Sequence, residues 1–261
     1  MKLIAVTFLC LCSILAKQSC CQITIAAASD LTYALSEVIA SYKSEHHDAA
    51  VAVTYGSSGK LCTQITQGAP FDLFMSADIS YPKQLVASGM AIEPVTQYGL
   101  GRIVLWSATL DATHMSLNDL RSDKIKHIAI ADPAHAPYGL RAQEALKKSG
   151  MWDAVQPRLV FGENIAQAAQ FVYSGNAEAG IIALSVALSP QLIKKGGYAI
   201  IPDSLHQPLL QAFVITAYGK KNNYTLVNNF VLFLATPKAR NIMERYGFSL
   251  PKQTSTSPSI K

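Results

Sequence analysis

The sequence predicts an α/β protein built from two lobes. Short apolar stretches with the residue content of strands alternate with segments whose apolar residues follow a helical period, along most of the 261 residues. Two longer β-rich runs, at 98–107 and 209–217, interrupt this alternation and can be strands that cross between the lobes. A hydrophobic content of 50% supports substantial cores. Two crossings form a hinge, and a hinge beside a cleft suits ligand capture.

The first lobe is predicted from three strands that each lead toward a helix. The strands are expected at 23–28, 51–55 and 71–78. The first runs into Ser29-Asp30 and the second into Gly56-Ser57-Ser58-Gly59, which are both helix-start sequences. A third helix is expected from about Pro82 to Gly89.

The second lobe is predicted to repeat this pattern after the first crossing. The elements expected there are strands at 128–131, 159–161 and 180–184, helix starts at Leu117 and Pro137, and a helix through Phe171. Helices at 224–234 and 237–246 are expected after the return crossing. We therefore assign 22–101 and 212–261 to the first lobe and 102–211 to the second.

Residues 1–21 have the features of an export signal peptide. Lys2 precedes an uncharged apolar stretch, 3–16, that is short for a bilayer span. Cys20 and Cys21 raise the alternative of a lipid-modified cysteine. However, Lys17-Gln18-Ser19 matches a lipoprotein signal poorly, so we expect a soluble protein in the periplasm. Every later apolar run is interrupted by Gly, Pro or charge within the length that a membrane helix needs.

Charge and cysteine content argue against several classes of function. Removal of 1–21 takes away Lys2 and Lys17 and no acidic residue, which lowers the net charge from +5 to +3. Because no run of basic residues occurs, nucleic acid is not expected as a partner. Cys62 would be the one remaining cysteine, so neither a disulfide framework nor a Cys-based metal site is expected.

The strand-to-helix junctions point to an anion site. A helix start leaves first-turn N–H groups without intrahelical partners, at the positive end of the helix dipole. Junctions of this kind follow the strands that begin at Ile23, Val51, Ile128 and Leu159. If they face one place, they form a cage of neutral hydrogen-bond donors. Each junction taken alone is also explained as an ordinary helix cap.

One enzymatic alternative is open at this point. Ser57-Ser58-Gly59-Lys60 is a Ser-x-x-Lys sequence at a helix start, a pattern found in serine acyl-transfer enzymes. No Ser-Asp-Asn occurs, and Lys148-Ser149-Gly150 lies at a predicted helix end instead of on an edge strand. A phosphate-binding loop is not expected, because the gap before Lys60 is wrong and Leu61 follows it. We therefore expect a binding protein and not an enzyme.

Several motifs together resemble the periplasmic molybdate-binding proteins of ABC importers. In chain order they are Ala27-Ala28-Ser29-Asp30-Leu31, Tyr55-Gly56-Ser57-Ser58-Gly59-Lys60-Leu61, Gly68-Ala69-Pro70-Phe71-Asp72-Leu73-Phe74-Met75-Ser76-Ala77-Asp78, Asp132-Pro133 with Ala136-Pro137-Tyr138-Gly139, and Arg245-Tyr246-Gly247-Phe248. The resemblance covers nearly the whole chain after the signal. It implies the class II periplasmic binding protein fold, with two lobes of mixed sheet flanked by helices and a two-strand hinge. A tetrahedral oxyanion is then hydrogen-bonded between the lobes, with no cofactor and no direct protein–molybdenum bond.

Carried over residue by residue, the resemblance gives the expected ligand contacts as Ser29, Asp30, Ser58, Tyr138 and Ile165. The two serines are expected to donate through their hydroxyls, and Asp30 and Ile165 through their backbone N–H groups. Ala183 stands where many members carry a Tyr, which makes Tyr138 the expected phenolic donor. The Asp30 carboxylate should point away, toward first-turn N–H groups or solvent, because it would repel an anion.

On this resemblance the chain captures molybdate or tungstate and delivers it to the membrane permease of an ABC importer, acting as a monomer. Sulfate or another tetrahedral oxyanion is the alternative ligand. A site made only of donors favours ions that are fully deprotonated at neutral pH, such as molybdate and sulfate. Phosphate species carry protons that need acceptors. The size of the cage, which would separate molybdate from sulfate, is not predicted from the sequence.

Overall fold

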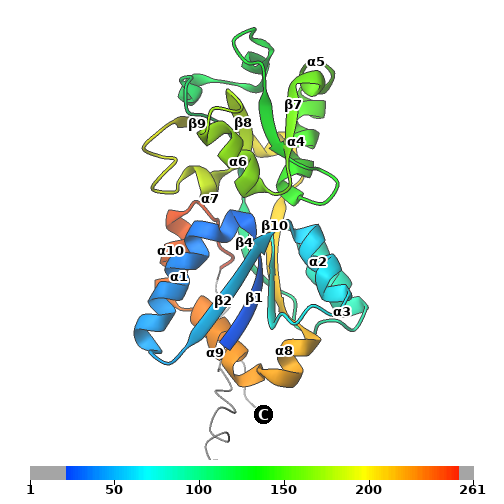
Figure 1. Cartoon of the computed structure of the whole chain (residues 1–261), viewed down its shortest axis with the longest axis vertical. Helices are drawn as coiled ribbons and strands as arrows, with labels where there is room; N and C mark the ends of the chain where they lie inside the picture. Colours follow the sequence, from blue (N-terminus) through cyan, green and yellow to red (C-terminus); the bar gives the residue numbers. More distant parts are fainter. Residues whose placement is uncertain (1–21, 253–261) are drawn as a thin grey trace, which may run out of the picture.

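The computed structural model describes residues 22–252 and contains two five-stranded sheets, one in each lobe. The predicted signal peptide lies outside the described residues. The strand order is β2-β1-β3-β10-β4 in the first lobe and β7-β6-β8-β5-β9 in the second. The second lobe lies above the first in Figure 1. The predicted fold, two lobes that each hold a mixed sheet flanked by helices, is confirmed.

The first lobe is built from the N-terminal part of the chain and the C-terminal helices. Its strands are β1 (Gln22–Ala28), β2 (Ala50–Gly56), β3 (Leu73–Ser76), β4 (Thr96–Gly101) and β10 (Leu209–Ile215). Its helices are α1 (Thr32–Glu45), α2 (Ser58–Thr66), α3 (Ser80–Ala87), α8 (Ala217–Asn222), α9 (Tyr224–Leu234) and α10 (Pro237–Arg245), and a 3-10 turn, η1 (Ser29–Leu31), links β1 to α1. β1 pairs in parallel with β2 and β3, whereas β10 is antiparallel to β3 and β4.

The second lobe has the same type of sheet. Its strands are β5 (Ile103–Ser107), β6 (Ile128–Ala131), β7 (Leu159–Gly162), β8 (Ala179–Ala183) and β9 (Gly197–Ile200), and its helices are α4 (Pro137–Lys148), α5 (Trp152–Val155), α6 (Ile165–Tyr173) and α7 (Leu184–Ala187). β6 is parallel to β7 and β8, and β5 is antiparallel to β8 and β9. The helix start expected at Leu117 forms only the 3-10 turn Leu117–Arg121.

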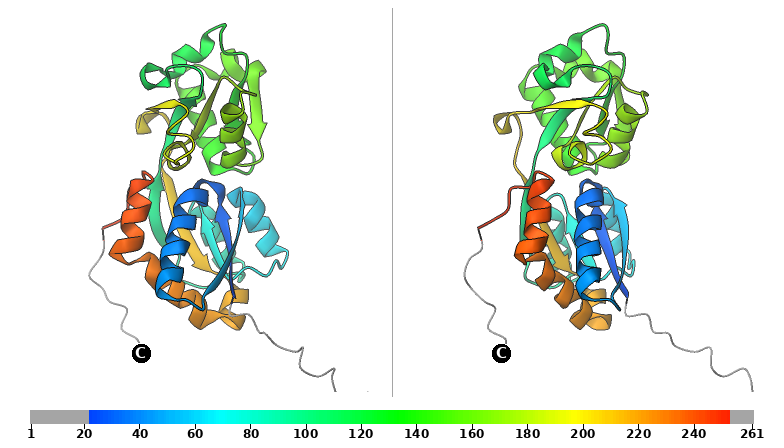
Figure 2. Two further views of the ribbon diagram at one scale, coloured as in Figure 1. Left: turned by 60° about the vertical axis from the view of Figure 1, so that its left-hand side comes forward. Right: turned by 90° about the vertical axis from the view of Figure 1, so that its left-hand side faces the viewer.

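The hinge differs from the sequence prediction in one respect. The long strand expected at 98–107 is two strands, because the chain leaves the first sheet after Gly101 and enters the second at Ile103. The return segment joins the first sheet from Leu209 and ends at Ile215, since Thr216 caps the next helix. In both views of Figure 2 the two connecting segments run along the same side of the molecule.

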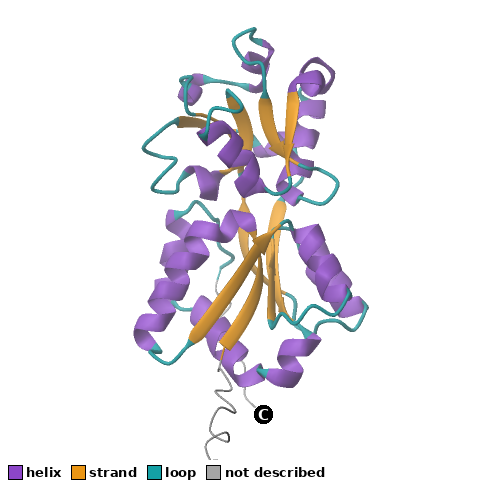
Figure 3. Ribbon diagram, in the orientation of Figure 1, coloured by secondary structure: helices purple, strands orange, loops and turns teal. Residues whose placement is uncertain are grey.

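Each sheet is covered by helices on both faces, as Figure 3 shows for the first lobe. α1 presents a buried stripe to β1, β2 and the C-terminal helices, comprising Ala34, Leu35, Val38, Ile39 and Tyr42. These positions follow the helical period predicted from the sequence, and truncation of one such leucine to alanine typically costs about 2–5 kcal/mol. Among residues 22–252, no helix combines the length and apolar character that crossing a bilayer requires.

Candidate functional site

A small pocket lies where the two lobes meet, at the carboxyl ends of β1, β2 and β3 and the starts of α4 and α6. It is nearly closed, with a cavity volume of about 10 Å³. Its lining residues are Ala28, Ser29, Asp30, Gly56, Ser57, Ser58, Ala77, Ala136, Pro137, Tyr138 and Ile165. The structure therefore brings together all the residues that the sequence nominated as ligand contacts. Ligand sites of open α/β sheets occur at such strand ends.

Two serine hydroxyls in this pocket are held as hydrogen-bond donors. The Ser58 Oγ accepts a bond from the Ala77 N–H at 3.0 Å, and the Ser29 Oγ accepts one from the Ala166 N–H at 3.4 Å. Both serines are buried, and neither hydroxyl donates to an acceptor within residues 22–252. Because each oxygen already accepts, its proton is the part left to bind a ligand. Ser29 joins the lobes, since Ala166 belongs to α6.

Four backbone N–H groups line the same pocket. Asp30, Ser58, Tyr138 and Ile165 each lie in the first turn of a helix or 3-10 turn, where no carbonyl of the preceding turn is available. None of these N–H groups has a partner among the hydrogen bonds of the described residues. The first two come from the first lobe and the last two from the second. An acceptor bound here would meet donors from both lobes.

The pocket has no cationic side chain in its lining. Arg141, on α4, is paired with Asp78 at 3.0 Å and with Glu144. Lys60 is paired with Glu163 at 3.0 Å. Negative charge at the pocket would therefore be balanced by neutral dipoles and not by an ion pair. Within the described residues, no group of three or more His, Cys, Asp or Glu side chains could hold a metal ion.

The Asp30 carboxylate does not lie where the sequence suggested. It is 1% exposed, and its Oδ2 accepts bonds from the Tyr138 hydroxyl at 3.0 Å and from the Gln211 Nε2 at 2.8 Å. The expectation that it faces solvent is wrong, because Tyr138 of α4 and Gln211 of β10 enclose it and supply the hydrogen bonds to its Oδ2. Burial raises the pKa of Asp30 to about 6, an effect that the bonds from Gln211 and Tyr138 oppose.

The Tyr138 phenol is also used differently from the prediction. Its one proton is donated to Asp30, and its oxygen accepts from the Gln211 Nε2 at 2.9 Å. Tyr138 is buried, and burial followed by the nearby Asp30 charge raises the pKa of its hydroxyl well above the usual range. In this arrangement the donor that Tyr138 offers to the pocket is its backbone N–H. The expected phenolic contact to the ligand stays a prediction, and in the described structure that proton is donated to Asp30.

Sequence reasoning missed three residues that surround Asp30. Gln211 binds Asp30 and Tyr138 through Nε2 and accepts from the Tyr98 hydroxyl at 2.7 Å through Oε1. Ser185, two positions after Ala183, donates its hydroxyl to the Asp30 carbonyl at 2.8 Å. One signal was available, because Gln211 is a lone amide within the apolar run Leu209–Ile215. Gly101 belongs to the same cluster, since a Cβ there would collide with Tyr138 and Gln211.

The Ser-x-x-Lys sequence does not form a nucleophile–base pair. The Ser57 hydroxyl hydrogen-bonds to the His135 Nδ1 at 2.9 Å, across the lobe junction. The Gly59 N–H donates to the His135 carbonyl at 3.0 Å, so this histidine holds α2 of the first lobe to the loop before α4. Lys60 points to Glu163 instead of Ser57. These contacts belong to the interface between the lobes, which we call the seam.

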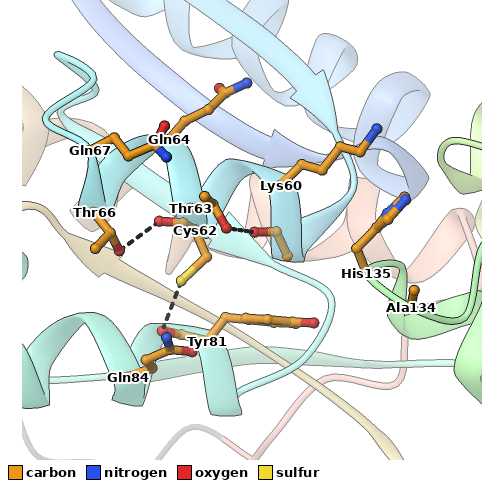
Figure 4. Close-up of a pocket in the computed structure, with 11 residues that line it drawn as sticks. Lys60, Cys62, Thr63, Gln64, Thr66, Gln67, Tyr81, Gln84, Ala134 and His135 are labelled. Atoms are coloured by element: carbon orange, nitrogen blue, oxygen red, sulfur yellow. Dashed lines mark hydrogen bonds between the residues drawn. The ribbon is translucent and has the colours of Figure 1, made fainter.

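A larger groove of about 580 Å³ lies beside this seam, between α2 and α3, with His135 at its mouth (Figure 4). Some of its polar groups form local bonds: Thr63 donates to the Gly59 carbonyl, Thr66 to the Cys62 carbonyl, and the Cys62 Sγ lies 3.9 Å from the Tyr81 carbonyl. The donors that converge on one point are in the small pocket and not in this groove.

Comparison with known proteins places this architecture in a family. The family model for bacterial extracellular solute-binding proteins matches residues 23–249. The chain is 36% identical over 229 residues to the molybdate-binding protein ModA of Rhodobacter capsulatus, covering 87% of this chain and 88% of that protein. It is 33% identical over 230 residues to ModA of Azotobacter vinelandii, covering 88% and 90%. The solved periplasmic molybdate-binding protein of A. vinelandii matches with a TM-score of 0.82 at 29% identity, covering 88% of this chain and 100% of that one.

The chain therefore belongs to the bacterial extracellular solute-binding protein family, a class of two-lobed receptors. Its similar relatives within that class are the molybdate-binding proteins named above, and the resemblance seen in the sequence motifs is confirmed. The relatives named above are molybdate-binding proteins, and in this chain Ser57 pairs with His135 and Lys60 with Glu163.

Proposed function

We infer that this protein captures molybdate or tungstate between its lobes and delivers the ion to the membrane permease of an ABC importer. The observation that carries this inference is the donor set of the interlobe pocket. Two hydroxyl protons and four backbone N–H groups converge on it, and no cationic side chain lines it. The proteins named as molybdate-binding that cover nearly the whole chain support the same ligand.

The donor set is sufficient for tight binding without a positive charge. A hydrogen bond to a charged acceptor contributes about 1.5–3 kcal/mol against water. Six such bonds exceed the roughly 8 kcal/mol of a micromolar complex, even at the lower figure and before the cost of association. Binding energy is shared between the lobes, because Ser29, Ser58 and the Asp30 N–H belong to one lobe and Tyr138 and Ile165 to the other.

The chemistry of the lining favours tetrahedral dianions that carry no proton. The single carboxylate in the lining is Asp30; its Oδ2 already accepts from Tyr138 and Gln211, and its Oδ1 is buried, so it presents no exposed acceptor. Phosphate at neutral pH carries protons that must be accepted, whereas molybdate, tungstate and sulfate do not. The ligand is cargo, so the protein needs no cofactor and no residue bonded directly to the metal.

The remaining parts of the proposal follow from this role. Residues 1–21 act as the export signal, the protein works in the periplasm as a monomer, and its partner is the permease. The lobes correspond to the expected segments, 22–101 and 212–261 for one and 102–211 for the other, except that 209–211 already pair with β4 in the first sheet, so the hinge lies at the β4–β5 and β9–β10 connections.

Calorimetric titration of the exported chain against molybdate, tungstate, sulfate and phosphate tests the proposal. We expect submicromolar binding of molybdate and tungstate, and binding of sulfate and phosphate at least a hundredfold weaker. Sulfate binding as tight as molybdate binding would replace the proposal with a sulfate receptor. Hydrolysis of a reporter ester that is lost in Ser57→Ala would instead support the acyl-transfer enzyme.

A further inference from the structure

The Asp30 carboxyl group occupies an unusual position for an acid beside an anion site. Its residue lines the interlobe pocket, yet the side chain is enclosed by segments from both lobes and the hinge. The Oδ2 takes both available donors, Tyr138 from α4 and Gln211 from β10. The Oδ1 is buried and has no hydrogen-bond partner within residues 22–252. Oδ2 therefore accepts two hydrogen bonds, whereas Oδ1 is buried without any hydrogen bond from the described residues to replace the water it loses on burial.

Within residues 22–252, no positive side chain pairs with the Asp30 carboxylate. The two ionisable groups that face it are the hydroxyls of Tyr138 and, through Gln211, of Tyr98 on β4. Most other ionisable side chains on the packed segments are engaged elsewhere: Tyr33 with Gln191, Tyr55 with Ser36 and Thr32, Glu37 with Arg245, Arg141 with Asp78 and Glu144, and Tyr173 beneath Lys195. Arg102, which follows Gly101 on the hinge, has no partner for its buried Nε within the described residues, and no charged side chain contributes to the shift of the Asp30 pKa. Adding an anion to the adjoining pocket places a second negative charge near this carboxylate, with little solvent between them to screen the repulsion.

We propose that capture of the oxyanion is coupled to uptake of one proton by Asp30 at its free oxygen, Oδ1. This inference rests on the proposed function, because it concerns the same pocket. The proton neutralises the acid, while Oδ2 keeps its bonds from Tyr138 and Gln211, so no contact of the closed form is lost. The group is already poised for this change, since burial raises its pKa to about 6 without ligand. A neighbouring dianion raises that pKa further.

Because binding is coupled to the uptake of a proton, the affinity for molybdate depends on pH. Below about pH 6 the acid is protonated before the ligand arrives, so affinity does not change with pH. Above that pH the free protein must take up a proton on binding, and affinity falls as pH rises, by at most about tenfold per pH unit for one proton. We expect the molybdate Kd to rise at least tenfold between pH 6 and pH 8.

Two variants isolate the Asp30 proton. Asp30→Asn mimics the protonated acid, because its amide oxygen can accept from Tyr138 and Gln211 and it carries no charge. Its Kd should stay within about twofold from pH 6 to pH 8. Asp153→Asn makes the same change at an exposed position on α5 and should keep the wild-type pH dependence. His135 also sits at the seam and is retained in both variants, so a pH effect that it causes would survive in Asp30→Asn.

Calorimetry in buffers of different ionisation enthalpy measures the proton directly. At pH 7.5 we expect close to one proton taken up per molybdate by the wild type and close to none by Asp30→Asn. Molybdate binding with no proton uptake and a flat pH profile in the wild type would overturn this inference alone. Failure to bind molybdate or tungstate at any pH would overturn the proposed function together with it. Tight phosphate binding at pH 8 that Asp30→Asn abolishes would show the carboxylate accepting a ligand proton, and would also overturn it.

Discussion

The two lobes contribute different kinds of donor to the same pocket. The first lobe supplies the hydroxyls of Ser29 and Ser58 in addition to two backbone N–H groups, whereas the second supplies only backbone N–H groups, those of Tyr138 and Ile165 at the starts of α4 and α6. The Ser58 hydroxyl is oriented inside its own lobe by Ala77, but the Ser29 hydroxyl is oriented by Ala166 of the second lobe. The Ser58 hydroxyl is therefore oriented by its own lobe, whereas the Ser29 hydroxyl is oriented only when the second lobe is in contact with the first.

Removing both hydroxyls should give the largest effect. Ser29→Ala and Ser58→Ala are each expected to weaken molybdate binding tenfold to a hundredfold, and the double variant more than either, because each loses a bond of about 1.5–3 kcal/mol to a charged acceptor. Ser44→Ala, at an exposed position on α1, is the matched control. Titration of all four proteins measures the difference. Unchanged affinity in both single variants would mean that these serines are only helix caps.

The contribution of the second lobe can be tested by deleting one N–H group. Ile165→Pro removes the donor at the first position of α6, where proline suits the helix and the preceding Asn164 is extended. Affinity should fall about tenfold to a hundredfold. Ile165→Ala keeps the N–H and removes most of the side chain, so it reports the packing cost alone. Equal losses in the two variants would show that this N–H does not bind the ligand.

The Asp30 cluster at the seam should leave a signature in the stability of the free protein. Burial raises the pKa of Asp30 from 3.8 to about 6, so the folded state binds more protons than the unfolded state between these values. The contribution of Asp30 to the free energy of unfolding should therefore be greatest below about pH 4 and decline as pH rises to about 6, by at most about 3 kcal/mol. The Tm of the wild type should therefore fall relative to the Tm of Asp30→Asn as the pH is raised from 4 to 7.5. A difference that does not change with pH would contradict it.

Tyr138→Phe should have the smallest effect on binding. Its hydroxyl donates to Asp30, so affinity is expected to change by less than about threefold while the Tm of the free protein falls, since a buried acceptor loses a partner. Tyr33→Phe, which loses only a 3.5 Å contact with Gln191, serves as the control. A tenfold loss of affinity with unchanged Tm would restore the phenol as a ligand donor.

The sequence was informative where local patterns determine structure. The strand-to-helix junctions at Ser29 and Ser58 and the helix starts at Pro137 and Ile165 were predicted because period, caps and proline act over a few residues. The edge strand Gly197–Ile200 was missed because it is partly exposed and too short to show alternation. The partners of Asp30 were missed because Tyr138 and Gln211 lie 108 and 181 residues away, and only tertiary packing brings them together.

The position of the bound ion tests the central claim most directly. Tungsten scatters X-rays anomalously, so a crystal of the tungstate complex would locate the ion without assumptions about the pocket. We predict one strong peak in the interlobe pocket, with oxygens within hydrogen-bond distance of the Ser29 and Ser58 hydroxyls and of N–H groups from both lobes, and with no Lys or Arg in contact. A peak in the groove between α2 and α3, or one held by Lys60 or Arg141, would contradict the neutral-donor site.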